Sequence, residues 1–213
     1  MFMEKFLADL EKRYPVLAPV IPQLARLIEE TIALYRNDGT LFLAGNGGSG
    51  ADAEHICTEL LKGFKSLRRL SDDDIQKLKD AGDGNSSLGE CLQYGLRTIS
   101  LLSHPPFHTA FGNDVDADLS FAQQLWALGR AGDMFIGIST SGNASNIRQA
   151  LIAARAKNIR TVLITGNRKG VCEEFADLVI AVPESETYRI QELQLPVYHT
   201  FCLAVEAAFF EQF

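Results

Sequence analysis

Apolar residues follow two patterns along the chain, and the two patterns alternate. Residues 3–13 and 20–37 carry apolar side chains at the spacing of amphipathic helices. Short apolar runs typical of buried strands occur at 40–44, 97–102, 134–139, 160–165 and 178–182. Helical patterns follow at 51–62, 118–129, 146–157, 171–175 and from residue 188 onward. This alternation predicts an α/β fold, with a doubly wound five-stranded parallel sheet flanked by helices.

One segment is longer than any connection this layout needs. Residues 66–96 contain "SDDDIQKLKD", which predicts a charged helix with Ser71 as its N-cap, followed by the loop sequence "AGDGNSS". We interpret the chain as a single domain, 1–213, with an insertion at 66–96. The insertion is either surface decoration or a lid over a site.

Composition and charge narrow the class of protein. The net charge of -7 argues against nucleic acid as a partner, although a local nest of backbone N–H groups can still bind a small anion. The four scattered cysteines fit a reducing compartment better than disulfides. No apolar run approaches the ~20 residues that span a membrane, and the first residues lack a signal-peptide core. We therefore expect a cytoplasmic protein without membrane association.

Two loops at the carboxyl edge of the predicted sheet have the chemistry of a phosphate site. The first, "GNGGSG", brings backbone close to a ligand at Gly47 and Gly48 and adds the side chains of Asn46 and Ser49. The second, "STSGNAS" (139–145), supplies hydroxyls at the start of a predicted helix. Either loop alone is explained by turns and helix caps, whereas both on one edge favour phosphate binding. Neither a dinucleotide fingerprint nor a Walker loop is present, so no nucleotide cofactor is expected.

Two histidines and a glutamate are candidates for proton transfer. His55 and Glu59 lie four residues apart and share one helix face, and His199 lies on the predicted terminal helix. Such groups serve as general acid and base on a sugar, or as ligands of a divalent metal. Taken singly, the His55–Glu59 pair is better explained as a surface pair and His199 as a buried core histidine.

A further histidine pair, His104 and His108 of "SHPPFH", has the same four-residue spacing. Pro105 and Pro106 argue against a helix that would align the pair. We therefore predict a loop there and no ligand role.

Three stretches together resemble one known family. "AGNGGSGADAEHICTEL", "AFGNDVDADLSFAQQLWALGRAGDMFIGISTSGNASNI" and "YRIQELQLPVYH" are similar, in this order, to the sugar isomerase (SIS) domain family, and within it to the phosphoheptose isomerases. The resemblance implies a three-layer sandwich, an aldose–ketose isomerase acting through an enediolate, and a homotetramer with active sites between subunits. It also implies a heptose biosynthetic role.

The resemblance also implies site residues. Glu59 is the implied base and His199 the implied acid. The phosphate and substrate contacts it implies are Asn46, Ser49, Asp114, Ser139, Thr140, Ser141 and Gln191. Ala144 stands where the family has a further phosphate-binding serine, with Ser145 one place on. One zinc ion is implied in some members, with His55, Glu59, Gln191 and His199 as its ligands.

Helix geometry constrains that ligand set. Gln191 and His199 are eight residues apart, about 12 Å along one straight helix, which is too far for one ion. Either Pro196 kinks the helix or the site combines two subunits, and we favour the second. Two alternatives to a heptose isomerase stay open: an isomerase of another sugar phosphate, and a non-catalytic SIS protein that binds sugar phosphates as a regulator or scaffold.

Overall fold

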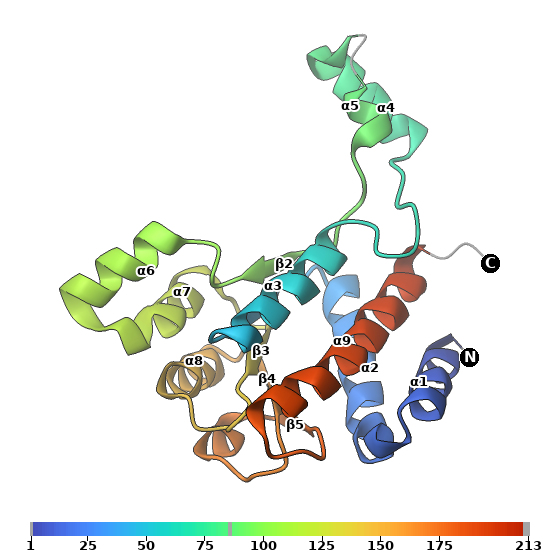
Figure 1. Ribbon diagram of the computed structural model, residues 1–213. Helices are drawn as coiled ribbons and strands as arrows, with labels where there is room; N and C mark the ends of the chain where they lie inside the picture. Colours follow the sequence, from blue (N-terminus) through green and yellow to red (C-terminus); the bar gives the residue numbers. More distant parts are fainter. Residues whose placement is uncertain (1, 85–86, 211–213) are drawn as a thin grey trace.

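The computed structural model of the chain describes residues 2–84 and 87–210. Its sheet has five parallel strands in the order β2-β1-β3-β4-β5 (Figure 1). These strands are β1 (Leu41–Gly45), β2 (Thr98–Ser100), β3 (Met134–Ile138), β4 (Arg160–Thr165) and β5 (Leu178–Ala181). The predicted doubly wound parallel sheet is confirmed, and the strand ends agree with the predicted runs to within one residue, except that β2 ends two residues earlier than predicted.

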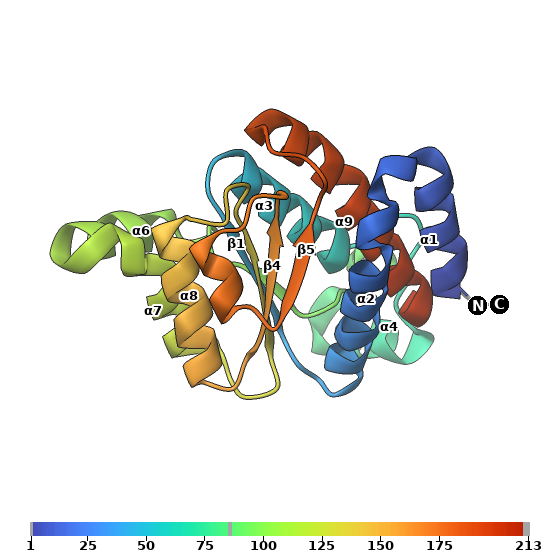
Figure 2. The same cartoon turned by 90° about the horizontal axis from the view of Figure 1, so that it is seen from below.

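Helices cover both faces of the sheet and make three layers (Figure 2). One face carries α1 (Phe2–Arg13), α2 (Ile21–Arg36), α3 (Gly48–Leu61) and α9 (Thr187–Phe210). The other face carries α7 (Ser120–Leu128) and α8 (Ser145–Ala156). Shorter 3₁₀ helices are η1 (Pro15–Val20), η4 (Ala117–Leu119) and η5 (Val171–Phe175).

The core consists of two apolar clusters, one on each face of the sheet. Successive strand side chains point to opposite faces, so Leu41 and Leu43 pack beneath α2, α3 and α9. Phe42 and Ala44 of the same strand pack instead beneath α7 and α8. The strands β1 and β3 have no polar side chain at any position because both of their faces are buried.

Helix α3 begins earlier than the glycine content suggests. The sequence predicts its start near residue 51, but the first helical residue is Gly48. Gly47, just before it, has φ +53° and ψ −121°, a conformation that L side chains rarely adopt. The turn from β1 therefore needs one glycine, and the next residues already belong to the helix.

The prediction of a loop at His104–His108 is wrong. The structure has a helix there, α6 (Pro105–Phe111), followed by the π-helical turn η3 (Gly112–Asp116). Both prolines occupy the first turn, where a missing N–H costs no helical hydrogen bond. His108 Nε2 then donates to the Leu101 carbonyl, and His108 Nδ1 hydrogen-bonds with Ser120 Oγ at 3.0 Å, so His108 joins α6 to its neighbours.

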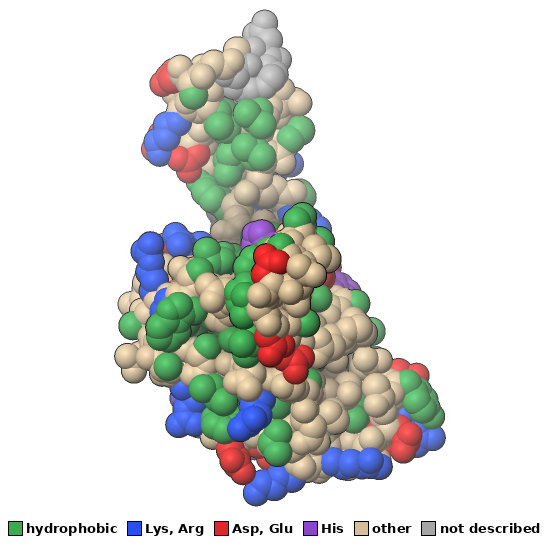
Figure 3. Space-filling view, turned by 90° about the vertical axis from the view of Figure 1, so that its left-hand side faces the viewer, with side chains coloured by type: hydrophobic (Ala, Val, Ile, Leu, Met, Phe, Trp, Pro, Cys, Tyr) green, Lys and Arg blue, Asp and Glu red, His purple; other side chains and the backbone are tan. Residues whose placement is uncertain are grey.

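The segment 66–96 forms a hairpin that projects from the body at the C-terminal end of α3 (Figures 1 and 3). It contains α4 (Asp72–Leu78), the π-helical turn η2 (Lys79–Asp83) and α5 (Leu88–Cys91). Ser71 caps α4 by accepting a hydrogen bond from the Asp74 N–H at 3.2 Å, as predicted. The hairpin leaves α3 at the end opposite to the predicted phosphate loops, so within one chain it does not cover them.

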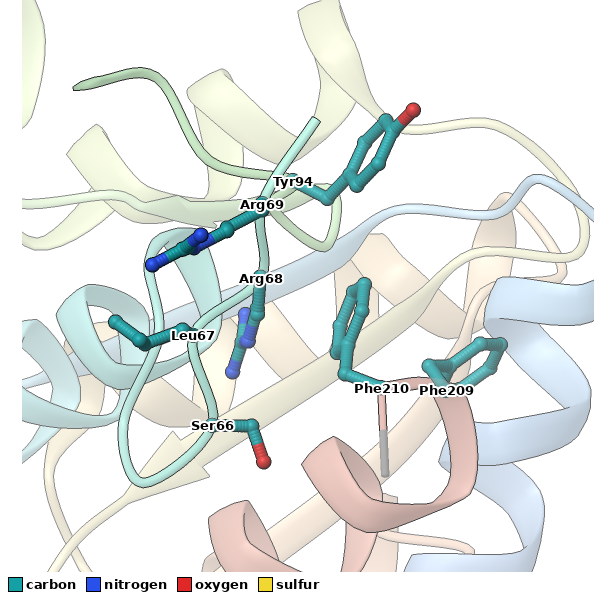
Figure 4. Close-up of a pocket in the computed structure, with 7 residues that line it drawn as sticks. All are labelled: Ser66, Leu67, Arg68, Arg69, Tyr94, Phe209 and Phe210. Carbon is teal, nitrogen blue, oxygen red and sulfur yellow. The ribbon is translucent and has the colours of Figure 1, made fainter. Parts of the chain in front are cut away.

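A buried ion pair fastens the base of this hairpin to the body. Arg68 Nε lies 2.9 Å from Glu206 Oε1 on α9, and both side chains are almost fully buried. The same guanidinium donates to the carbonyls of Leu60 and Glu59 at 2.7 and 2.9 Å. It also lies 4.6 Å from the ring of Phe210, beside a pocket at the base of the hairpin (Figure 4). Arg68 thus ties the last turn of α3 to α9.

The carboxylate of Glu206 is saturated by further donors. It accepts hydrogen bonds from the backbone N–H groups of Phe64, Lys65 and Ser66, at 2.8, 2.8 and 3.2 Å. A buried charge is tolerated where several donors replace water. The turn after α3 is therefore shaped around this one side chain.

The helix α9 is long and apolar enough to span a membrane by length and composition alone. Of its most apolar window, 61% is buried inside the protein, and it contributes Val197, Phe201 and Val205 to the larger core cluster. It is the core helix of the three-layer fold.

We expect Arg68→Met to lower the free energy of unfolding by about 3 kcal/mol, because it leaves the buried Glu206 carboxylate without its charged partner. Urea denaturation measures this change. Arg69→Met is the matched control, since Arg69 is exposed, and we expect it to stay within about 0.5 kcal/mol of the unchanged protein. Equal effects of the two substitutions would contradict a stabilising role for the buried pair.

Candidate active site

The two predicted phosphate loops meet at the carboxyl edge of the sheet. Asn46 follows β1 and Asn146 lies in the first turn of α8, and their side-chain amides exchange two hydrogen bonds of 2.8 and 2.9 Å. Carboxyl ends of neighbouring parallel strands share one edge, which explains why loops 100 residues apart lie side by side. The juxtaposition expected from the sequence is present.

The second loop forms a tight turn lined by hydroxyls. The Gly142 N–H donates to the Ser139 carbonyl at 3.0 Å, and the Asn143 N–H donates to Ser141 Oγ at 3.2 Å. Ser139 is buried, Thr140 is half-buried and Ser141 is exposed. The first turn of α8 follows directly, so its unpaired N–H groups face the same region.

Gln191 belongs to this end of the site. A Cβ atom placed on Gly48 would lie 2.4 Å from Gln191 Nε2, so the amide of Gln191 packs directly on the backbone of α3's first residue. Only glycine leaves room for that contact. Gln191 therefore lies with the phosphate loops.

His55 and Glu59 form a pair on α3, as their spacing predicts. His55 Nε2 lies 3.2 Å from Glu59 Oε1, and Lys62 Nζ lies 3.2 Å from Glu59 Oε2. The Glu59 side chain is only 12% exposed, whereas that of His55 is 39% exposed. A carboxylate that is partly shielded from water in this way is a competent base for a carbon-bound proton.

His199 packs against this pair from α9. Its ring centroid lies 5.0 Å from that of His55, and its Nε2 atom is buried with no hydrogen-bond partner among residues 2–84 and 87–210. Burial lowers the pKa of His199, and the neighbouring His55 lowers it further. A neutral imidazole with a free nitrogen is thus available beside Glu59.

Three polar residues at the site were not singled out from the sequence. Tyr198 donates to Asp52 at 3.1 Å and also contacts His55, while the buried amide of Gln194 has no partner within the described residues. Asp52 precedes His55 by three residues, a spacing that places both on one face of α3. The spacing of Asp52 and His55 was the one sequence feature that could have identified Asp52 as part of the site.

The two halves of the site lie far apart within one chain. Ser49 and Glu59 are ten residues apart on α3, about 15 Å along its axis. Helix α9 continues through Pro196 without interruption. Gln191 of α9 contacts Gly48 at the start of α3. His199 of α9 contacts His55, which lies seven residues further along α3.

Asp114 lies outside both groups. It sits in η3, the turn between α6 and α7, and its exposed carboxylate accepts a hydrogen bond from the Asn113 side chain at 2.9 Å. Helix α6, which leads into η3, projects away from the sheet (Figures 1 and 2). A substrate contact by Asp114 stays a prediction.

The proposed metal ligands are brought together only in part. His55, Glu59 and His199 are neighbours with the donor chemistry that Zn²⁺ prefers, but Gln191 lies at the other end of α3. Across residues 2–84 and 87–210, no three His, Cys, Asp or Glu side chains are arranged to hold a metal ion. The residues of one chain therefore do not fit a four-ligand zinc site.

A sheet edge lined by the predicted phosphate loops, together with a histidine–glutamate cluster, is an arrangement suited to an enzyme that acts on small phosphorylated molecules. Comparison with known proteins agrees. The SIS domain family model matches residues 109–208. Phosphoheptose isomerases from Aneurinibacillus thermoaerophilus and Roseiflexus sp. (strain RS-1) are 39% and 36% identical, over 88% and 90% of this chain and 84% of each relative.

Solved structures give the same result. A phosphoheptose isomerase from Neisseria gonorrhoeae superposes with a TM-score of 0.71 at 27% identity, over 96% of this chain and 93% of that one. One from Francisella tularensis has a TM-score of 0.75 at 23% identity, over 95% and 94%, and supports the fold. The chain belongs to the phosphoheptose isomerase family of SIS domain proteins, and it is an isomerase of the sugar-phosphate class.

We expect His199 to titrate below the ordinary histidine pKa of about 6.5, because its lowered pKa is a consequence of burial. The unfolded chain then binds more protons than the folded chain as pH falls below that value, so acid destabilises the fold through this group. An NMR titration of the histidine side chains in the presence of a chelator measures it, with the His199 signal assigned from His199→Gln. Titration of His199 at or above the ordinary value would contradict the expectation.

Proposed function

We propose that this protein interconverts sedoheptulose 7-phosphate and D-glycero-D-manno-heptose 7-phosphate. The single observation that carries the proposal is the Glu59–His55–His199 cluster, in a chain up to 39% identical to phosphoheptose isomerases. Binding alone does not require a shielded carboxylate beside a neutral imidazole. This argues against a purely regulatory SIS protein.

The proposed reaction moves one proton between neighbouring carbons. Glu59 takes the proton from C1 of the open-chain ketose, and the electron pair of that C–H bond forms an enediolate with the C2 carbonyl. Glu59 then returns the proton to C2, which gives the aldose. His199, neutral because of its lowered pKa, donates a hydrogen bond to the developing oxyanion and passes a proton between the two oxygens.

The phosphate is held by the sheet edge in this proposal. Backbone at Gly47 and Gly48 and the first turn of α8 supply N–H donors. The side chains proposed to contact substrate are Asn46, Ser49, Ser139, Thr140, Ser141, Ser145, Gln191 and Asp114. Ser145, exposed in the first turn of α8, would then serve in place of the serine missing at Ala144.

Because the two halves of the site are about 15 Å apart along α3, we propose that each active site combines two subunits. One subunit contributes the phosphate loops and Gln191, and another contributes Glu59 and His199. This makes the working protein an oligomer, for which we propose the tetramer of the family. We also propose, from the same family relationship, that the protein is cytoplasmic and takes part in heptose biosynthesis.

A zinc ion also remains a prediction. Zn²⁺ bound by His55, Glu59 and His199, with Gln191 of another subunit, would polarise the carbonyl oxygen. The proton transfers assigned to Glu59 and His199 do not depend on it.

The structure gives one reason to consider a different sugar. Loops that bind the phosphate group do not measure the length of the sugar chain. The hairpin 66–96 begins only seven residues after Glu59. Another ketose phosphate, or an amino-sugar phosphate, would undergo the same proton transfer. Assays against a panel of such sugars distinguish these substrates.

We expect Glu59→Gln and His199→Ala to lower kcat by about 10²- to 10⁴-fold, because each removes a proton-transfer group. The measurement is conversion of sedoheptulose 7-phosphate with and without chelator. Glu54→Gln is the control: Glu54 lies on the same helix but bonds to Ser100 and Ser103. Turnover unaffected by both substitutions would remove the assigned mechanism.

The shared site has its own test. Glu59→Gln protein and Ser139→Ala/Ser141→Ala protein each carry one defective half, so we expect both to be inactive alone. Mixed oligomers of the two contain some sites with both halves intact, and they should regain a measurable part of the activity. Mixtures that exchange subunits and stay inactive, or a fully active monomer, would contradict a site shared between subunits.

A further inference from the structure

A chain of hydrogen bonds joins α9 to the candidate proton-transfer groups on α3. The Tyr198 hydroxyl donates to Asp52 Oδ1 at 3.1 Å. The hydroxyl oxygen of Tyr198 also lies 3.1 Å from His55 Nδ1. His55 Nε2 in turn lies 3.2 Å from Glu59 Oε1. Asp52, His55 and Glu59 occupy one face of α3, while Tyr198 reaches that face from α9.

The Tyr198 hydroxyl can donate only one of the hydrogen bonds in this series. A tyrosine hydroxyl has one hydrogen, and in this arrangement Asp52 receives it. A phenol has an ordinary pKa of about 10, so it keeps that hydrogen at neutral pH. The hydroxyl oxygen can then only accept from His55, which requires the imidazole proton to be on Nδ1.

The surroundings of Tyr198 hold it in place. Its side chain is 3% exposed, and its ring makes edge contacts with His55 and His199 at centroid distances of 5.4 and 5.1 Å. The hydroxyl is therefore fixed relative to both histidines. A fixed acceptor selects one tautomer of its neighbour.

We propose that Tyr198, supported by Asp52, is a positioning residue that fixes His55 as the Nδ1–H tautomer and turns its Nε2 lone pair toward Glu59. Its role in turnover rests on the proposed function. In that reaction Glu59 becomes a neutral acid after it takes the C1 proton, with the electron pair left in the enediolate. The new Glu59 O–H then has an acceptor at His55 Nε2, which holds it until the proton returns to C2.

The test of the tautomer uses the substrate-free protein labelled with ¹⁵N, in the presence of a chelator. Long-range ¹H–¹⁵N spectra distinguish a protonated from an unprotonated ring nitrogen, and His55→Gln assigns the signal. We expect a protonated Nδ1 and an unprotonated Nε2 in the unchanged protein, and a shift toward the Nε2–H form in Tyr198→Phe. Tyr35→Phe is the matched control, because it removes a hydroxyl bonded to Thr98 at 2.7 Å, away from the site, and should leave the His55 signal unchanged.

The same variants separate positioning from folding. Tyr198→Phe should lower kcat by about 10- to 100-fold with little change in KM, while its melting temperature stays near that of Tyr35→Phe. An Nε2–H tautomer in the unchanged protein, an unaltered His55 signal in Tyr198→Phe, or full kcat in that variant would overturn the proposal. Because the spectra need no substrate, they decide the tautomer even if sedoheptulose 7-phosphate proves not to be turned over.

Discussion

The contact between α3 and α9 determines where every candidate proton-transfer group lies. Both helices pack on the same face of the sheet, and their shared surface carries His55 and Glu59 from one helix and His199 from the other. The buried pair of Arg68 and Glu206 closes the far end of that contact by binding the last carbonyls of α3. Burial in this contact lowers the pKa of His199 and leaves its Nε2 atom without a partner within the described part of the chain. The packing of α3 against α9 thus accounts for both the position and the protonation of this imidazole.

The length of α3 is the reason for proposing a site shared between subunits. The helix begins at the phosphate loops, beside Gln191, and reaches Glu59 about 15 Å further along its axis. In the proposed function, phosphate binding and proton transfer are assigned to opposite ends of α3, so a second subunit is needed to bring them together. The oligomer is then part of the active site in the proposed function.

Sequence patterns predicted the sheet because buried strands are apolar at every position, as in 134–138. They failed at α6, where two prolines argue against a helix but occupy its permissive first turn. The pair His55–Glu59 was predictable from its spacing on one helix. The bond from Tyr198 to Asp52 joins residues 146 positions apart, and the contact of Gln191 with Gly48 likewise depends on how α9 packs. No local pattern encodes such contacts.

The central claim is that Glu59 moves a proton between C1 and C2 through an enediolate, and hydrogen isotope exchange tests it most directly. The reaction is run with sedoheptulose 7-phosphate in D₂O, and the sugars are examined by NMR and mass spectrometry. The account predicts that part of the Glu59 O–H exchanges with solvent while the enediolate exists, so solvent deuterium appears at C2 of the aldose and at C1 of the remaining ketose, and neither label appears with Glu59→Gln. Conversion or labelling that is unchanged in Glu59→Gln would contradict it.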